Sequence, residues 1–144
     1  MEPQSRDRKG AQAVLNVVHS YAWSYDENDM ECLSSIFEDD ATTRGVVAGT
    51  DAGWGPWQGQ EAIVAGLSDI RSQQADRRRH QLTTPLFLSL TDEAAVVKVY
   101  LSILATPDGD RPRLITTGHY VATLRKSAGH WKVSRLDAEL DGSF

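Results

Sequence analysis

The stretch YAWSYDENDMECL, residues 21–33, places a carboxylate beside two tyrosines in a segment that otherwise has the pattern of an amphipathic helix. Tyr21 and Tyr25 are one helical turn apart, and Asp26 falls at the edge of the same apolar stripe. A carboxylate in such a partly desolvated position can take up and release protons near neutral pH. We therefore expect Asp26 to line a pocket and to exchange protons with a small organic molecule.

A histidine on a later segment completes a possible acid–base pair with Asp26. The sequence alternates between apolar and polar residues from residue 78 to residue 90, and His80 shares the apolar side with Leu82 and Leu86. Together, Asp26 and His80 could support enolisation, loss of water or ring closure without a metal or an organic cofactor. The alternatives are a solvated Asp26 near a helix end and a His80 that is hydrogen-bonded within the core.

Further aromatic and imidazole side chains are candidates for binding the substrate. Tyr100, like the tyrosines of the first helix, could donate a hydrogen bond to a carbonyl oxygen that becomes negative. His119 and Tyr120 fall on opposite faces of one predicted strand, so either could face the cavity. Trp54 and Trp57 lie in a segment with glycine and proline, where they form either a lid over the pocket or a plug at one end of the core.

Two carboxylates near the end of the sequence alternate with an arginine. Asp137 and Glu139 share one face of the last predicted strand with Arg135. A carboxylate–arginine–carboxylate relay inside a pocket would be suited to opening an epoxide. A solvent-exposed ladder of charges is the simpler interpretation, and we expect these residues at the surface.

The order of the predicted elements indicates an α+β fold. Helical periodicity covers residues 10–27, a short helix capped by Asp29 follows, and a strand precedes a loop over residues 48–59. After a third helix the period changes from helical to alternating, which predicts strands over residues 78–90, 94–105, 113–126 and 131–140. Helices first and long strands afterwards predict one α+β domain over residues 10–144, behind a flexible tail of residues 1–9.

Composition and charge narrow the classes of partner. The net charge of -5 argues against nonspecific nucleic-acid binding, and no apolar run approaches the roughly 20 residues that span a bilayer. Cys32 is the single cysteine, so a cysteine-based zinc site and an intramolecular disulfide are excluded. We expect a cytoplasmic protein without metal or cofactor. Because the long strands carry apolar residues on both faces, we also expect a homo-oligomer, either a dimer or a trimer.

Four stretches of the sequence resemble one known family. They are SYDENDMECLSSIFEDDA, GQEAI, RRRHQLTTP and GHYVATLRKSAGHWKV, and together they span nearly the whole chain. They are similar to the SnoaL-like branch of the nuclear-transport-factor-2-like superfamily. The resemblance implies a cone-shaped, curved mixed β-sheet wrapped by three N-terminal helices around a deep pocket.

The resemblance also implies an activity and a set of site residues. The first helix is similar to that of scytalone dehydratase, whose tyrosine and adjacent aspartate match Tyr25 and Asp26, and the strand with His80 resembles one that carries an active-site histidine. Bile-acid 7α-dehydratase has a tyrosine five residues before its catalytic aspartate, as Tyr21 precedes Asp26. The implied protein is a dehydratase, isomerase or cyclase acting on a hydrophobic oxygenated small molecule, as in polyketide-type secondary metabolism. A noncatalytic binding or assembly domain is the alternative.

Overall fold

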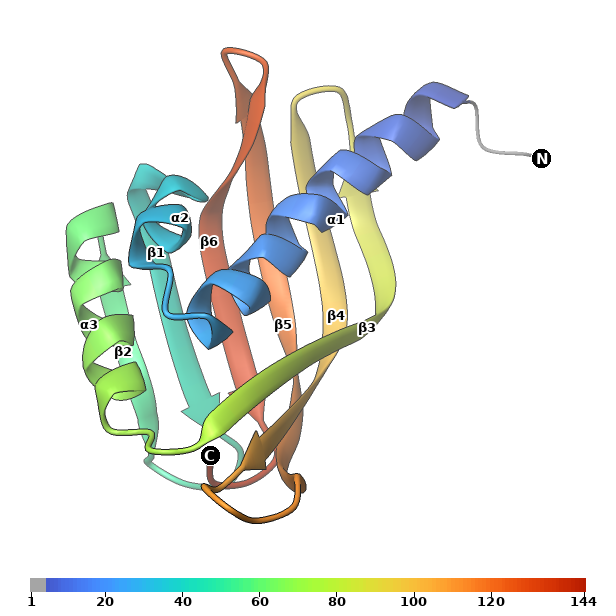
Figure 1. Ribbon diagram of the computed structural model, residues 1–144. Coiled ribbons are helices and arrows are strands. Elements are labelled where there is room, and N and C mark those ends of the chain that lie inside the picture. The colour runs from blue at the N-terminus through green and yellow to red at the C-terminus, as the bar shows by residue number, and fades with distance from the viewer. Residues whose placement is uncertain (1–4) are drawn as a thin grey trace.

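The computed structural model describes residues 5–144 (Figure 1). Within this range the chain forms three helices and six strands: α1 (Ser5–Asp26), α2 (Met30–Ser35), β1 (Phe37–Val47), β2 (Gly53–Gln58), α3 (Gln60–Ser72), β3 (Arg77–Leu90), β4 (Ala94–Thr106), β5 (Arg113–Ser127) and β6 (His130–Leu140). The predicted α+β class is confirmed, and the four long strands end within one or two residues of their expected positions.

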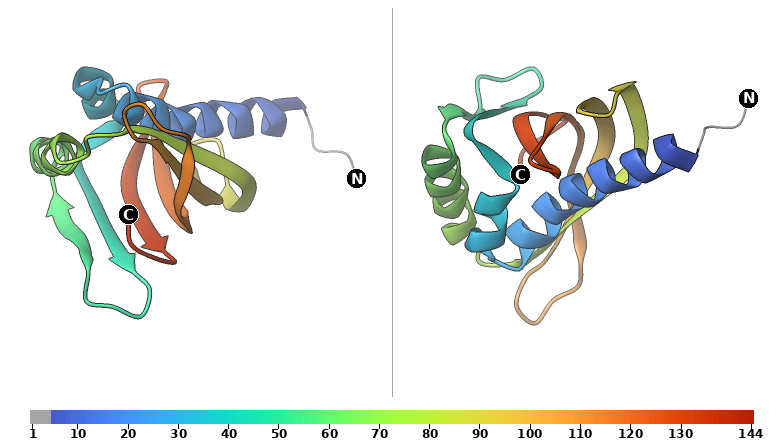
Figure 2. Two further views of the ribbon diagram at one scale, coloured as in Figure 1. Left: turned by 60° about the horizontal axis from the view of Figure 1, so that its bottom comes forward. Right: turned by 90° about the horizontal axis from the view of Figure 1, so that it is seen from above.

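The six strands form one curved mixed sheet in the order β2-β1-β6-β5-β4-β3. The β1–β6 pair is parallel and the other four pairs are antiparallel. The sheet bends around the helices, so that α1 crosses its concave side while α2 and α3 lie toward β1 and β2 (Figures 1 and 2). This arrangement leaves β3 as an edge strand, and the end of α1 lies beside its first residues.

The core lies between the concave face of the sheet and the three helices. Its largest fully buried side chains come from both layers: Phe37, Leu33, Ile63, Leu101, Leu124 and Leu140. In β4 the residues with odd numbers from Ala95 to Ala105 are buried, whereas those with even numbers face outward. The alternation therefore settles which face of β4 lies inside, which periodicity alone left open.

Three local predictions are wrong. Helix α1 already begins at Ser5, so residues 5–9 of the expected tail are helical, and residues 1–4 lie outside the described residues. The expected loop of residues 48–59 contains strand β2, which pairs with β1. In β3 the pairing register shifts after Thr83 and Thr84 has a φ of 53°, so Leu86 and Leu88 lie exposed and Phe87 packs on the core instead.

Gly118 is required where β5 and β6 are closest. A Cβ atom at this position would overlap the carbonyl oxygen of Glu139 and press on the backbone of Leu140. We expect Gly118→Ala to lower the free energy of unfolding by about 1–3 kcal/mol, because the backbones of two paired strands must separate. Urea denaturation measures the change.

A matched substitution in α1 provides the control for Gly118→Ala. Gly10 has open space around its Cβ position and lies inside a helix. Gly10→Ala should therefore raise the free energy of unfolding by roughly 0.5–1 kcal/mol, since alanine favours the helix over glycine. Equal effects of the two substitutions would show that the contact of Gly118 with β6 does not limit stability.

Candidate active site

Asp26 joins the last residue of α1 to the edge strand β3. Its Oδ2 accepts a hydrogen bond from the backbone N–H of His80 at 2.7 Å, and its Oδ1 lies 2.6 Å from Nδ1 of the same histidine. Both side chains are more than nine-tenths buried. Asp26 is therefore neither solvated nor unpaired, and the sequence correctly brought it together with His80.

The contact with Asp26 selects one tautomer of His80. A carboxylate oxygen only accepts hydrogen bonds, so Nδ1 of His80 carries the proton and donates it to Oδ1. Neutral His80 then has its lone pair on Nε2, which can act as a base. The Tyr25 ring packs edge-on against the imidazole with ring centroids 5.1 Å apart, which helps to hold it in place.

An arginine from α3 stabilises the end of α1 that carries the dyad. Arg71 donates from Nε to the carbonyl of Tyr25 at 3.1 Å and from Nη2 to the carbonyl of Asp26 at 3.2 Å. Both carbonyls belong to the last turn of α1, where that of Tyr25 also accepts from the backbone N–H of Asn28 at 3.1 Å and a cation complements the helix dipole. Arg71 thereby positions the backbone from which Asp26 extends.

A small internal cavity lies next to His80. Its volume is about 30 Å³, which is room for one or two water molecules. The aromatic residues of its wall are Tyr21, Tyr25, Trp54, Tyr120 and Phe144, and the aliphatic ones are Leu67, Ile70, Ile103 and Leu140. The polar residues of the wall are Gln74, Arg78 and His80. Asp26 is absent from this wall. It borders an open, polar cleft on the outer side together with Glu27 and Arg79, so it contacts the cavity only through His80.

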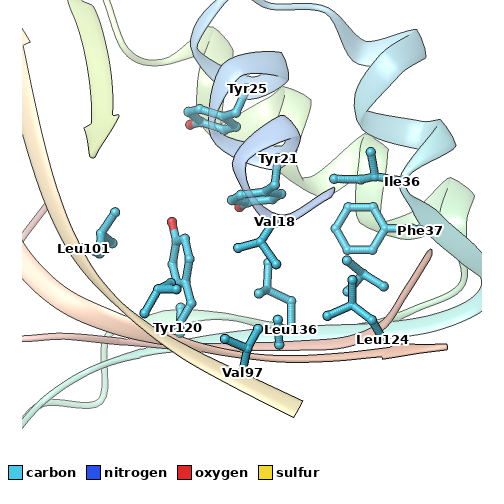
Figure 3. Packing of buried hydrophobic residues seen from close by; sticks show 14 of the residues in the cluster. Val18, Tyr21, Tyr25, Ile36, Phe37, Val97, Leu101, Tyr120, Leu124 and Leu136 are labelled. Carbon is cyan, nitrogen blue, oxygen red and sulfur yellow. The ribbon is translucent and has the colours of Figure 1, made fainter. Parts of the chain in front are cut away.

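The tyrosine hydroxyls of the cavity are largely committed to one another. Tyr25 donates to Oε1 of Gln74 at 2.7 Å. The Tyr120 hydroxyl is hydrogen-bonded to that of Tyr21, and their rings pack edge to face with centroids 5.7 Å apart. Figure 3 shows Tyr21 and Tyr25 one turn apart on α1, with Tyr120 rising from the sheet toward them. Because Tyr120 donates to Tyr21, the Tyr21 proton remains for a bond to a ligand.

Burial keeps all three tyrosines protonated. Desolvation raises the pKa of Tyr25 to about 12, while the nearby charges of Arg78 and Arg71 act in the opposite direction. Burial also raises the pKa of Tyr21 and of Tyr120 well above the ordinary value. These hydroxyls can therefore donate hydrogen bonds over the whole physiological pH range but do not supply a phenolate base.

Three predicted substrate-binding residues lie outside the cavity. Tyr100 is 62% exposed and His119 pairs with it across β4 and β5, so both lie on the outer face of the sheet. Trp57 packs against α3, since its ring occupies the space beside Gly66. Trp54 does line the cavity, where its ring packs on Phe144 with centroids 5.3 Å apart.

The charged ladder of β6 also lies on the outer face. Arg135 donates to Asp137 at 2.8 Å, and Arg135 and Glu139 are exposed. None of these residues belongs to the cavity wall, which leaves the idea of an epoxide-opening relay without structural support. Across the described part of the chain, no group of three or more His, Cys, Asp or Glu residues lies together as a metal site would require.

Sequence reasoning missed Arg78 and Gln74 as cavity residues. Arg78 is two residues before His80 on the same strand, so the alternation that placed His80 inward also placed Arg78 inward. The signal was present, but an arginine in the run RRRH resembles a solvated basic cluster. Gln74 follows the end of α3, where no periodicity indicates its direction.

Comparison with known proteins identifies the family. The family model described as SnoaL-like domain matches residues 8–137. The chain belongs to the SnoaL-like domain family. A comparison with curated proteins found no match.

Solved structures confirm the SnoaL-like fold. A protein of unknown function with a cystatin-like fold from Nostoc punctiforme has 20% identity and a TM-score of 0.80, with 100% of this chain and 98% of that one covered. A protein from Catenulispora acidiphila in complex with S-DNPA has 23% identity and a TM-score of 0.76, covering 91% and 92%. ActVI-ORFA from Streptomyces coelicolor has 17% identity and a TM-score of 0.76, covering 91% and 97%. Among the described residues no helix is long and apolar enough to cross a membrane.

We expect Asp26→Asn to change the tautomer of His80. The amide oxygen can still accept from the backbone N–H of His80, but the amide NH₂ then faces Nδ1 and requires a lone pair there. The proton should move to Nε2, which abolishes the base. The ¹⁵N chemical shifts of the imidazole report the change, and the free energy of unfolding should fall by about 1–3 kcal/mol.

Glu27→Gln is the matched control for Asp26→Asn. Glu27 is the next residue in the chain, is exposed and loses the same charge on substitution. The tautomer of His80 should stay as in the wild type. An unchanged ¹⁵N spectrum in Asp26→Asn would show that Asp26 does not select the tautomer.

Tyr25→Phe should change the pH dependence of stability in the alkaline range. The pKa of Tyr25 rises from 10.0 to about 12 on folding, so the unfolded chain releases this proton first and stability is lost as the pH rises from 10 to 12. Phenylalanine removes this contribution, and the decline of unfolding free energy should become less steep by up to about 1.4 kcal/mol per pH unit. Urea denaturation between pH 9 and 12 measures the slope. Tyr100→Phe, the same substitution at an exposed position, is the matched control.

Proposed function

We propose that this SnoaL-like protein is a cofactor-independent acid–base enzyme, a dehydratase, isomerase or cyclase. Its substrate is a hydrophobic oxygenated small molecule of the kind found in polyketide-type secondary metabolism. The observation that supports this most directly is the buried Asp26–His80 pair beside a cavity with aromatic walls. An orienting carboxylate behind an imidazole is a common way to build a general base.

The proposed chemistry begins with removal of a proton from a carbon next to a carbonyl group. Nε2 of His80 takes the proton, and Asp26 stabilises the imidazolium that forms. The electron pair of the C–H bond moves onto the carbonyl oxygen, to which the Tyr21 hydroxyl donates a hydrogen bond. Return of the proton at another carbon gives isomerisation. Loss of a β-hydroxyl group as water gives dehydration, and attack of the carbanion on a second carbonyl gives ring closure.

The cavity must widen to admit such a substrate. A volume of about 30 Å³ is far below the roughly 300 Å³ or more of an ordinary ligand site. Trp54 is half-buried and Phe144 is exposed, and the two wall residues contact each other through ring edges. Movement of this pair opens the cavity with the smallest loss of buried contacts, which favours Trp54 as part of a lid and Trp57 as a structural contact.

The family relationship supports a small-molecule ligand. The Catenulispora acidiphila structure, 23% identical, contains S-DNPA, and we infer that the present chain also binds an organic molecule in its concave side. The alternative proposal, a noncatalytic binding or assembly domain, keeps the cavity and omits the proton transfer. Assembly into a dimer or trimer stays a prediction. Exposed apolar side chains on the outer sheet and its edge favour it: Leu86, Leu88, Tyr100 and Leu114.

Proton exchange at carbon tests the enzymatic proposal without knowledge of the substrate. We expect the wild type to accelerate deuterium incorporation next to the carbonyl of 1-tetralone in D₂O, followed by ¹H NMR. His80→Gln should reduce the accelerated rate by about 10²–10⁴-fold, the usual contribution of a general base. Asp26→Asn should reduce it as well, because it places a proton on Nε2.

His130→Gln is the control for this exchange experiment. His130 is exposed at the start of β6, and its replacement should leave the rate unchanged. If the rate with His80→Gln equals that of the wild type while both proteins still bind 1-tetralone, the protein is a binding domain and the enzymatic proposal is wrong.

A further inference from the structure

Two buried N–H groups in the cavity wall have no hydrogen-bond partner. They are Nη1 of Arg78 and Nε1 of Trp54. The Arg78 side chain is 9% exposed, so bulk water does not replace the missing acceptor. A buried donor without an acceptor is unfavourable, and such a group in the wall of a cavity indicates that an occupant supplies the acceptor.

Asp76 holds the Arg78 guanidinium in one orientation. Nε of Arg78 donates to Oδ1 of Asp76 at 2.9 Å, and Nη2 contacts Oδ2 at 3.4 Å. Both bonds use one edge of the planar group and leave Nη1 outside the ion pair. Because the fork is rigid, the ion pair fixes the guanidinium of this cavity-lining residue before any ligand arrives.

The other polar groups of the wall offer few acceptors. Oε1 of Gln74 already accepts from Tyr25, and the Tyr21 oxygen accepts from Tyr120. Most of the uncommitted groups of the wall are donors, on Gln74, Arg78, Trp54 and Tyr21, whereas Nε2 of His80 offers a free lone pair. A trapped water molecule would bring two donors of its own and would leave one of them unsatisfied. An occupant that only accepts matches this wall better.

We propose that Arg78 and Trp54 form an anion-binding subsite, and that the ligand of the cavity is a flat unsaturated molecule carrying an oxyanion. A carboxylate meets this description, as does the enolate oxygen that the proposed proton transfer creates. An unsaturated ring suits the aromatic side chains of the wall, among them Tyr21, Tyr25 and Tyr120, because aromatic groups pack well against one another. The inference rests on the proposed function only in that the same cavity takes a ligand. Because Asp76 balances the charge of Arg78, the preference arises from aimed donors in a desolvated site rather than from net charge.

A pair of matched probes tests the subsite directly. Isothermal titration calorimetry at pH 7.5 compares 2-naphthoate with 2-naphthamide, which share a ring system and differ in the oxyanion. The wild type should bind the carboxylate at least tenfold more tightly than the amide. Arg78→Gln should remove most of this preference while changing the affinity for the amide by less than threefold. Trp54→Phe keeps an aromatic wall without the N–H group, and should weaken carboxylate binding several-fold.

Arg79→Gln is the control for charge. Arg79 is the neighbouring residue, is exposed beside Glu27 and changes the net charge by the same amount. It should behave as the wild type. If Arg78→Gln does not fold, as judged by circular dichroism, Trp54→Phe and Arg78→Lys carry the test, and Arg78→Lys should lose part of the preference because lysine lacks the fork.

Several results would overturn the subsite. One is equal affinity of the wild type for the two probes. Another is that neither probe binds at millimolar concentration, which would leave the cavity to water alone. The third is an equal loss of carboxylate affinity in Arg78→Gln and Arg79→Gln. The outcome is separate from that of the exchange experiment. A carboxylate preference that depends on Arg78, together with exchange that does not depend on His80, would leave the subsite standing and remove the enzymatic proposal.

Discussion

The two hydrogen bonds from His80 to Asp26 connect the secondary structure with the chemistry. Because β3 is an edge strand, every second backbone N–H along it has no strand partner. Asp26 accepts a hydrogen bond from one of these groups, the backbone N–H of His80. The same carboxylate accepts from the side chain of that residue. One group therefore attaches the helix to the sheet edge and orients the imidazole. A change that disturbs either function disturbs the other, which explains why a charged side chain is buried at the end of an otherwise apolar helix face.

The polar groups of the cavity around this pair are of two kinds, those that already have a hydrogen-bond partner and those that have none. The Tyr25 and Tyr120 hydroxyls donate hydrogen bonds to neighbouring groups, and burial keeps both hydroxyls protonated by raising their pKa values. Donors that remain free are found on Tyr21, Arg78 and Trp54, which come from a helix and from two strands far apart in the sheet order. Because α1, β2 and β3 meet only through the curvature of the sheet, the donor set exists only in the folded chain.

The sequence predicted those features that depend on local periodicity. The stripe of α1 placed Tyr21 and Tyr25 at the cavity, and the alternation of β3 placed His80 there. Asp26 is buried but borders the outer cleft, so it reaches the cavity only through His80. Periodicity separates two faces of a strand but does not say which one is covered, and for this reason Tyr100 and His119 stood among the candidates although both lie on the outer face. It also fails where a bulge intervenes, as at Thr84, after which the inner and outer residues of β3 exchange until a second register shift returns Leu90 to the core side.

Other parts of the site depend on contacts that no local pattern contains. Trp54 and Trp57 are three residues apart in the sequence, but only Trp54 reaches the cavity. The reason is two glycines in other elements: Gly45 on β1 leaves room for the ring of Trp54, and Gly66 on α3 leaves room for the ring of Trp57. Such complementary pairs can be recognised only once the elements are packed together.

The family alone does not determine the reaction, because one fold supports several chemistries through different residues in its cavity. In this chain the residues themselves restrict the choice. A single base with its orienting carboxylate lies beside buried donors, and within the described residues no cluster suited to a metal is present. This arrangement is suited to reactions in which one proton leaves carbon and negative charge collects on oxygen. Whether water is then lost or a ring closes depends on the groups that the substrate places next to that carbon. Under the proposed function, the protein would supply the common first step and the substrate would determine the product.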